Sequence, residues 1–407
     1  MNTVINALME RRFFKRTAIL LNQQIGNLMQ KVYSCRIKAQ YHGDVEVAHN
    51  KIVFMTYNDT YMCNPKYIAE EILRQGLPWD LVWLVPAKGS MPAPYFPSKI
   101  RQVRRKTFGA YLEKVSARVW IDNSLNFQWE PTPKKKGQIY METWHGSMGI
   151  KRVGKDDVQN KRWVETARRV GRLTDFCISN SDFEDGVFRE TFWPNAEILR
   201  YGHARNDCLF HEDEILAARR KVSEAFALEP SDKILLYAPT FRESKRLDVY
   251  DIDFERLALS LGRAFGGTWK ILFRLHFHNR KSHMADLPDC VLPATSYPDM
   301  QELMMASDAG ITDYSSWAYD YILLRRPLFI YAADRDEYDH ERGLYFTLES
   351  TPFPIAENNE ELNKNVLRFQ DDLYQTEIDR FLKEKGCVED GHAAQRIVEK
   401  LKEYLSE

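Results

Sequence analysis

Short apolar segments alternate with amphipathic segments along this chain from about residue 50, and this order restricts the fold more than any other feature. One series runs from the apolar segment 51–57 to the segment 196–201. A second series begins at 233–238, after a charged, alanine-rich stretch at 212–227. Repeated strand–helix–strand order builds parallel sheets with helices on both faces. We therefore predict an α/β chain with two doubly wound, Rossmann-like domains and an interdomain cleft.

The two series also predict how the chain is divided. Parallel sheets bind ligands at the carboxyl ends of their strands, so a cleft between two such domains would place loops from both around one substrate. The predicted parts are a basic amphipathic helical segment (residues 1–45), an N-terminal Rossmann-like domain (46–210), a C-terminal Rossmann-like domain (211–390) and a C-terminal helix (391–407).

The first 40 residues carry an uneven charge. They hold seven lysines or arginines and one acid, Glu10, which gives this segment a charge of +6. Apolar residues recur there at helical spacing. We predict a basic amphipathic helix that attaches residues 1–40 to an anionic membrane surface. The alternative is a helix docked on its own domain or on a second subunit of a homo-oligomer. The apolar residues are Ala18, Leu21, Ile25, Leu28 and Val32.

Composition narrows the class of protein further. A net charge of −1 over 407 residues gives no indication of a nucleic-acid partner. The six cysteines are far apart and form no CxxC pair, so neither a zinc site nor a disulfide framework is predicted. The sequence demands no cofactor, and a need for a divalent metal stays open. No apolar run approaches the roughly 18–20 residues that span a bilayer, so we expect a peripheral protein on the cytosolic side.

A polar turn follows the apolar segment 309–312 and precedes a predicted helix at 317–325. Asp313 is expected to cap this helix. Ser315 and Ser316 can reach a phosphate that binds at the helix start. The alternative is a plain Asp/Ser helix cap without a ligand.

A second polar cluster follows the predicted strand 138–144 and contains His145 beside Gly146. A histidine next to a glycine at a strand end can face a ligand that approaches the backbone closely. Histidine also suits proton transfer near neutral pH. The alternative is a histidine that only hydrogen-bonds its own loop.

Two further strand ends carry arginine. Arg242 follows the strand 233–238, and Arg274 lies at the end of the strand 270–275. The planar fork of arginine suits phosphate oxygens, although a lone arginine in such a place is usually a surface salt bridge. His276 and His278 alternate as metal ligands can, but no nearby carboxylate or cysteine completes a set.

A loop is predicted around residues 334–336, and a turn that contains Arg342 at 341–346.

In this order, these segments resemble the CDP-glycerol glycerophosphotransferase family, whose enzymes build or prime teichoic acids and related polyol-phosphate polymers. The resemblance covers roughly residues 140–395. It rests on Trp144–Gly146, Tyr201–Asp207, Tyr237–Arg242, Arg274–His276, Asp313–Ser316, Ala332–Tyr338 and Arg342–Phe346.

The resemblance implies a glycosyltransferase-B type fold, with residues 46–210 on the acceptor side and 211–390 binding a CDP donor. It implies that His145 is the catalytic base and that His276 is a second active-site residue near the donor pyrophosphate. Donor or phosphate binding is implied for Thr240, Arg242, Arg274, Asp313, Ser315, Ser316 and Arg342. Acceptor contact or loop support is implied for Gly146, Ser147, Lys151, Arg205, Asn206 and Asp207.

The reaction expected from the resemblance is transfer of a polyol phosphate, with glycerol phosphate first among the candidates, from a CDP-activated donor to a hydroxyl of a lipid-linked or polymer acceptor. CMP would leave, in teichoic acid or capsule-like polymer synthesis at the cytoplasmic face of the membrane. The chain departs from the family where Ser147–Arg152 replaces the usual Thr-Pro and lysine pair, which leaves the polyol open. Alternatives are a ribitolphosphotransferase, a nucleotide-sugar glycosyltransferase or epimerase, and a non-catalytic scaffold.

Overall fold

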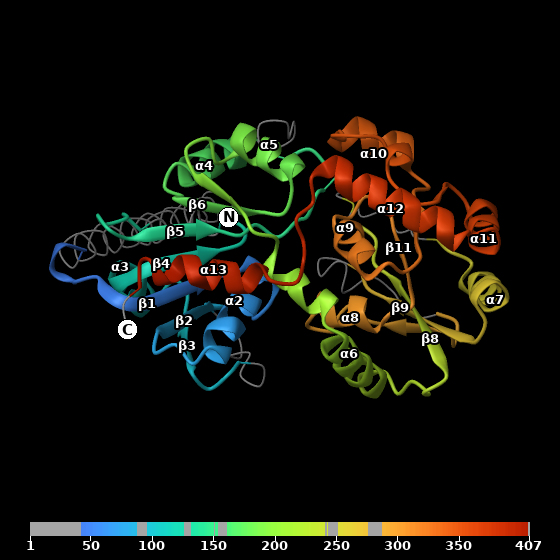
Figure 1. The fold of residues 1–407 in the computed structure, drawn as a ribbon, viewed down its shortest axis with the longest axis horizontal. Helices are drawn as coiled ribbons and strands as arrows, with labels where there is room; N and C mark the ends of the chain where they lie inside the picture. The colour runs from blue at the N-terminus through green and yellow to red at the C-terminus, as the bar shows by residue number, and fades with distance from the viewer. Residues whose placement is uncertain are drawn as a thin grey trace, which may run out of the picture.

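The computed structural model contains two parallel β-sheets, each with helices packed on its faces (Figure 1). It describes residues 42–87, 96–125, 132–149, 151–153, 161–240, 242, 251–275 and 287–405. The predicted α/β fold with two doubly wound sheets is confirmed. The amphipathic helix predicted within residues 1–45 lies almost wholly outside the described residues.

The first sheet has seven strands in the order β3-β2-β1-β4-β5-β6-β7, and every pairing is parallel. The central strands are buried on both faces, which explains why they read as continuous apolar runs. The strands are β1 (Ala48–Met55), β2 (Asp80–Val85), β3 (Ile100–Arg104), β4 (Ala117–Asp122), β5 (Ile139–Glu142), β6 (Phe176–Ser179) and β7 (Glu197–Arg200).

Helices from both ends of the described chain cover this first sheet. They are α2 (Cys63–Arg74), α3 (Phe108–Ser116), α4 (Lys161–Gly171), α5 (Asp182–Thr191) and α13 (Ala393–Lys402). Ile397 and Leu401 of α13 pack in one apolar cluster with Ile52 and Phe54 of β1. The chain therefore returns to the first sheet after it has completed the second, as Figure 1 shows for α13 beside α2. We call the first sheet and these helices the first lobe.

The second sheet has six strands in the order β10-β9-β8-β11-β12-β13, again all parallel. We call this sheet and its helices the second lobe. Its strands are β8 (Asp232–Tyr237), β9 (Thr268–Phe273), β10 (Val291–Pro293), β11 (Ala309–Thr312), β12 (Leu328–Tyr331) and β13 (Ile355–Ala356). Its helices are α6 (Glu212–Ala225), α7 (Phe254–Phe265), α8 (Met300–Ala306), α9 (Trp317–Tyr321), α10 (Arg335–Arg342), α11 (Asn359–Leu367) and α12 (Asp371–Lys385).

The predicted loop at 334–336 and turn at 341–346 are wrong in part, because Arg335–Arg342 forms helix α10. The sequence of this helix is almost entirely polar, and Tyr338 is its one aromatic residue. Tyr338 is buried and stacks on Tyr314, with ring centroids 3.9 Å apart. One apolar residue in eight produces no apolar periodicity, so no helical pattern could be recognised there.

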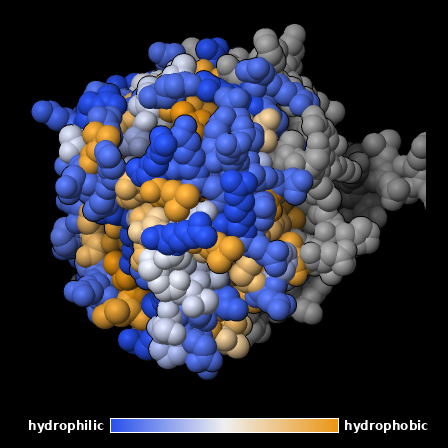
Figure 2. All heavy atoms as spheres, turned by 90° about the vertical axis from the view of Figure 1, so that its right-hand side faces the viewer, coloured by the Kyte–Doolittle hydropathy of each residue, from blue (hydrophilic) through white to orange (hydrophobic). Residues whose placement is uncertain are grey.

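The outer face of the second lobe is largely hydrophilic, with small apolar groups between the polar ones (Figure 2). Its exposed apolar side chains include Leu259 of α7 and Leu367 of α11. Among the described residues, no helix is long and apolar enough to cross a membrane.

Candidate active site

A cleft of about 260 Å³ lies between the two lobes. Loops that follow strands of both sheets line it, as expected for ligand sites at the carboxyl ends of parallel strands. Five predicted site residues meet there: His145, Arg205, Arg274, Ser315 and Ser316. The other lining residues are Tyr57, Met62, Cys63, Asn123, Ala238, Pro239, Leu275, Met300, Gln301, Trp317 and Asp320.

The orientation of His145 is set by a main-chain group. Its Nδ1 lies 2.6 Å from the carbonyl oxygen of Asn123, which follows the neighbouring strand β4. A carbonyl oxygen can only accept, so Nδ1 carries the proton and donates. Nε2 therefore keeps its lone pair. The ring of Tyr57 stacks on His145, with centroids 5.6 Å apart and planes 13° apart.

The surroundings of His145 favour the neutral imidazole. The ring is exposed in the cleft, yet desolvation by the protein around it lowers its pKa below the ordinary value of 6.5. The bond to Asn123 acts in the opposite direction, and the positive charges of Arg205 and Lys151 lower the pKa further. A neutral imidazole with an unprotonated Nε2 can accept a proton at neutral pH.

Glu142, the last residue of β5, holds both loops that place His145. Its Oε1 accepts from the main-chain N–H of Trp144 at 3.0 Å, and its Oε2 accepts from that of Leu125 at 3.1 Å. Trp144 adopts a left-handed φ of +52°, which is rare for a bulky residue. Glu142 is fully buried, and desolvation followed by the nearby Asp122 raises its pKa well above the usual range. Sequence reasoning gave Glu142 no role.

Arg205 connects the loop of His145 to the second lobe. It lies in the 3₁₀ helix η5 (Ala204–Phe210), which links the lobes. Its guanidinium donates to the carbonyl oxygen of Gly146 at 2.8 Å and forms a buried ion pair with Asp320 of α9 at 3.1 Å. The arginine is 3% exposed, so this pair is shielded from solvent. Arg205 therefore supports the loop as well as lining the cleft.

The turn before α9 forms the opposite wall. Ser315 and Ser316 line the cleft and are half-buried. A Cβ built on Gly146 would lie 3.7 Å from the hydroxyl of Ser316, and one on Gly149 would lie 3.4 Å from its Cβ. These are ordinary contact distances, so the His145 loop packs directly against the serine turn.

Asp313 does not cap α9, contrary to the sequence prediction. Its carboxylate accepts from the main-chain N–H of Thr240 at 2.8 Å and from that of Tyr314 at 2.6 Å. It also pairs with Arg242 at 2.9 Å. The first residue flanking α9 is Ser316, whose side chain makes no capping bond. Asp313 thus fixes the loop after β8 to the turn after β11.

Arg242 lies behind this turn and does not line the cleft. Its guanidinium pairs with Asp334 at 2.6 Å as well as with Asp313, and it is 5% exposed. The rings of Tyr314 and Tyr338 lie 5.1 and 4.7 Å from it. Arg242 and Thr240 are placed to hold the serine turn. Arg274, in contrast, reaches the cleft and donates to the carbonyl oxygen of Tyr297 at 2.5 Å.

Of the six residues predicted to contact the acceptor or support loops, only Arg205 lines the cleft, and the other five, Gly146 included, lie outside its lining. Ser147 accepts from Asn180 at 2.7 Å, and Lys151 forms an antiparallel bridge with Leu344 of the second lobe. Asn206 donates to Asp320 at 2.8 Å and to Glu389 at 2.9 Å. The carboxylate of Asp207 accepts from the main-chain N–H groups of Ala393 and Ala394, and so caps helix α13.

His276 and His278 lie outside the described residues, and so does the side chain of Arg342. Their predicted roles stay predictions. Across the described part of the chain, no three His, Cys, Asp or Glu side chains gather in a way that could hold a metal ion.

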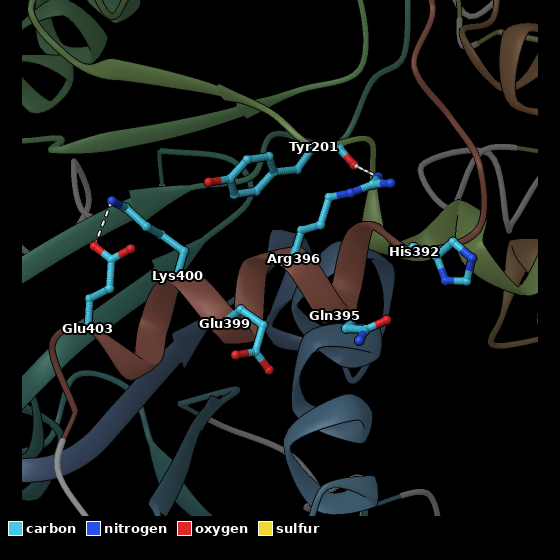
Figure 3. A pocket seen from close by; sticks show the side chains of 7 residues that line it. All are labelled: Tyr201, His392, Gln395, Arg396, Glu399, Lys400 and Glu403. Carbon is cyan, nitrogen blue, oxygen red and sulfur yellow. Dashed lines mark hydrogen bonds and ion pairs between the residues drawn. The ribbon is translucent and has the colours of Figure 1, made fainter.

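A second, more open cavity of about 530 Å³ lies along α13 (Figure 3). None of the predicted site residues lines it. Arg396 bonds there to the carbonyl oxygen of Tyr201, and Lys400 pairs with Glu403. We assign no function to this cavity.

Comparison with known proteins identifies relatives over nearly the whole chain. The model of the CDP-glycerol:poly(glycerophosphate) glycerophosphotransferase family matches residues 37–403. A teichoic acid poly(glycerol phosphate) polymerase of Staphylococcus epidermidis is 29% identical over 85% of this chain and 49% of its own length. A teichoic acid glycerol-phosphate transferase of Staphylococcus aureus is 26% identical over 86% of this chain and 92% of its own. The chain thus spans about half the length of the polymerase it matches.

Solved structures agree with the fold. The wall teichoic acid polymerase TagF superposes with a TM-score of 0.75 at 28% identity, over 88% of this chain and 91% of that structure. The same polymerase has been solved as a histidine variant soaked with CDPG. An epimerase structure from Listeria monocytogenes, described as a putative UDP-N-acetylglucosamine 2-epimerase, has a TM-score of 0.52 at 12% identity, over 87% of this chain and 96% of that structure, and so supports the fold alone.

Proposed function

The chain belongs to the CDP-glycerol:poly(glycerophosphate) glycerophosphotransferase family, and from this membership we propose that it transfers glycerol phosphate from CDP-glycerol to a hydroxyl of a lipid-linked or polymer acceptor. CMP is the second product. The relatives named as teichoic acid glycerol-phosphate transferases and polymerases support this reaction. They also support a role in teichoic acid or a similar cell-surface polymer.

One observation supports the proposal most: a general base lies on one side of the cleft, and groups that can bind an anion lie on the other side. His145 contributes an unprotonated Nε2 from the first lobe. Arg274, Ser315 and Ser316 contribute a cation and two hydroxyls from the second. Phosphoryl transfer needs these groups, because positioning and charge stabilisation supply most of its catalysis.

In the proposed mechanism, the attacking acceptor hydroxyl gives its proton to Nε2 of His145. Its oxygen bonds to the β-phosphorus of the donor, while the bond from that phosphorus to the bridging oxygen breaks. CMP leaves with the electron pair. Arg274 and the serine hydroxyls bind the pyrophosphate and the charge that develops on it. A well-placed base contributes about 10²–10⁴-fold to such a step.

The setting of the reaction is also a proposal. We place the enzyme at the cytoplasmic face of the membrane, where a lipid-linked acceptor is available. Attachment through the basic residues 1–40 supports this placement, since these residues carry a charge of +6.

A panel of activated donors tests the proposal. We expect CMP release from CDP-glycerol when the purified chain meets an acceptor that ends in glycerol phosphate, with a product one or more units heavier by mass. Release from CDP-ribitol alone would favour a second function, because a ribitol-phosphate primase of Bacillus spizizenii is 25% identical over 88% of this chain. UDP release from a UDP-sugar, without any CMP release, would overturn the proposal.

A further inference from the structure

We propose that the start of helix α2 binds a phosphate group of the acceptor, next to the hydroxyl that attacks the donor, and that the side-chain amide of Gln301 donates to the same phosphate. The inference rests on the function proposed above and deepens it, because it assigns a binding site to the acceptor. Sequence reasoning gave neither α2 nor Gln301 a role.

The start of α2 offers main-chain donors to the cleft. The helix begins at Cys63, and both Cys63 and the preceding Met62 line the cleft. No side chain caps this end of the helix, and its first turn holds no acid. Within the described chain, no group accepts from the main-chain N–H of Cys63 or of Asn64. Uncapped N–H groups and the helix dipole together favour a bound anion.

A second feature indicates a ligand at the same place. Gln301 is 5% exposed and lines the cleft. Its main-chain N–H donates to Asp299 at 2.9 Å, but its side-chain amide has no partner among the described residues. Neither amide atom is closed off from solvent, in contrast to Nδ2 of Asn123, so a ligand in the cleft can contact it. A phosphate oxygen that enters the cleft can accept from the NH₂ group.

An ion pair between the lobes holds Gln301 beside α2. Lys66, in the first turn of α2, pairs with Asp299 at 2.6 Å. The other oxygen of the Asp299 carboxylate accepts from the main-chain N–H of Gln301. The helix start and the amide therefore approach the cleft from opposite lobes, and a phosphate between them would be held by both.

The proposed site lies beside the loop that carries the base. Asn64, in the first turn of α2, donates from Nδ2 to the carbonyl oxygens of Thr143 and Trp144, at 2.8 and 3.2 Å. Trp144 directly precedes His145, so these bonds fasten the start of α2 to the loop of the base. The groups assigned to the pyrophosphate, Arg274 and the two serines, follow strands β9 and β11 of the second lobe. We therefore assign the phosphate at α2 to the acceptor, whose hydroxyl must reach Nε2 of His145.

The substitution Gln301→Glu places a negative charge where the amide would donate. The side chain keeps its size, and the main-chain bond to Asp299 is retained. We expect the KM for an acceptor ending in glycerol phosphate to rise about tenfold, the effect of losing one hydrogen bond to a charged group. The Kd for CDP-glycerol, measured by calorimetry at physiological salt, should change less than about threefold, because salt screens the added charge from the pyrophosphate.

Met62→Asp tests the helix start itself and predicts two opposite changes. Met62 is the residue that flanks the first turn of α2, and an aspartate there can cap the helix, so the unfolding temperature should rise. The same carboxylate occupies the free N–H groups and repels a phosphate, so the acceptor KM should rise about tenfold. A substitution that only damages the fold would lower the unfolding temperature.

Gln375→Glu is the matched control for Gln301→Glu. Gln375 lies in α12, outside the cleft lining, and its Nε2 donates to the carbonyl oxygen of Arg325 at 2.9 Å. This variant also exchanges an amide for a carboxylate, but its acceptor KM should stay at the level of the unaltered chain. If Gln301→Glu does not fold, as judged by thermal denaturation, Gln301→Met is measured against the same expectations.

Two results would overturn the inference alone. An acceptor KM that stays unchanged in either folded variant would show that the start of α2 and Gln301 do not bind the acceptor together. A rise in the Kd for CDP-glycerol as large as the rise in acceptor KM would assign the site to the donor. Absence of CMP release by the unaltered chain would overturn the proposed function itself, and is distinguished from the other two results because it needs no variant.

Discussion

Two regions of this molecule each contain a histidine after a strand of the first sheet, but the ring is bonded differently in each. Among the described residues, His145 bonds through Nδ1 to Asn123, and none of them bonds to its Nε2. His203 is fully buried, accepts from Asn64 through Nδ1 at 3.4 Å and donates from Nε2 to Glu184 at 3.1 Å. A histidine with one hydrogen-bonded ring nitrogen can still accept a proton, whereas a histidine with both ring nitrogens hydrogen-bonded has a structural role.

The surroundings of the two histidines differ in the same way. The His203 region is a set of paired polar groups, in which Glu389 accepts from Asn180, Asn206 and the main-chain N–H of His203. Around His145, the amide of Asn123 keeps an unbonded donor. Asn180 and Asn206 also each have a buried carbonyl oxygen without a partner in the described chain, so the clearest difference between the two regions is in the histidine ring nitrogens.

The strongest test of this comparison is His145→Ala. We expect kcat to fall about 10²–10⁴-fold, because the variant lacks the base. The Kd for CDP-glycerol should be nearly unchanged, since the pyrophosphate contacts are assigned to the other wall. Rapid-quench measurement of CMP release gives the first value, and calorimetry gives the second. Turnover at the rate of the unaltered chain would remove His145 from the mechanism.

Substitution of Arg205 measures how much the buried Arg205–Asp320 ion pair contributes to the stability of the fold. Arg205→Met leaves the buried carboxylate of Asp320 without its cation, which costs about 3–5 kcal/mol of unfolding free energy. Denaturant unfolding measures this loss. The control is Asp379→Asn, which breaks the exposed ion pair with Arg325 and should have a far smaller effect. Equal losses of unfolding free energy in the two variants would show that the buried ion pair contributes no more to stability than the exposed one.

Replacing Ser315 and Ser316 together by alanine tests the wall that faces His145. Each hydroxyl that binds a charged phosphate contributes at least about 1 kcal/mol, so loss of both should raise the Kd for CDP-glycerol roughly 30-fold or more. Ser350→Ala serves as the control, because its exposed hydroxyl donates to the carbonyl oxygen of Thr347 in its own turn, away from the cleft lining. An unaltered Kd in the double variant would mean that the serines do not bind the pyrophosphate.

The pH dependence of stability gives the most gradual expected effect, because it is spread over more than two pH units. Desolvation raises the pKa of Glu389 from 4.5 to about 7, partly opposed by His203, Asn180 and Asn206. Between these two values the folded chain binds a proton that the unfolded chain has released. This contribution to stability is therefore complete below pH 4.5 and is lost as the pH rises to 7, with a slope of up to about 1.4 kcal/mol per pH unit.

Glu389→Gln should flatten this decline between pH 5 and 7 in urea unfolding. A smaller decline should remain, because desolvation also raises the pKa of Asp207, to about 6. A pH profile that the substitution leaves unchanged would contradict the assigned pKa of Glu389.

Sequence reasoning located the cleft because strand ends can be recognised from apolar runs that stop at polar residues. His145, Arg274, Ser315 and Ser316 were found in this way. It could not tell how Asp313 is used, because its partner Thr240 is 73 residues away and the register of β8 on β11 brings them together.

The residues that were missed carry no local signal. Asn123 acts through its main-chain oxygen, which every residue type has. Glu142 is the last residue of an apolar strand. Its position in the sequence does not indicate that its carboxylate bonds to the main chain of two loops. Arg242 was predicted to bind phosphate, and that role stays a prediction; the two carboxylates that pair with it come from distant segments, so these ion pairs could not be recognised locally.

The return of the chain to the first lobe through α13 has a mechanical consequence. The polypeptide crosses between the lobes twice, once through η5 and once through residues 386–392, and Asp207 of the first crossing bonds to the start of α13 after the second. Two connections that are joined to each other restrict rotation of one lobe relative to the other more than a single connection does. They therefore help to keep His145 opposite the serine turn.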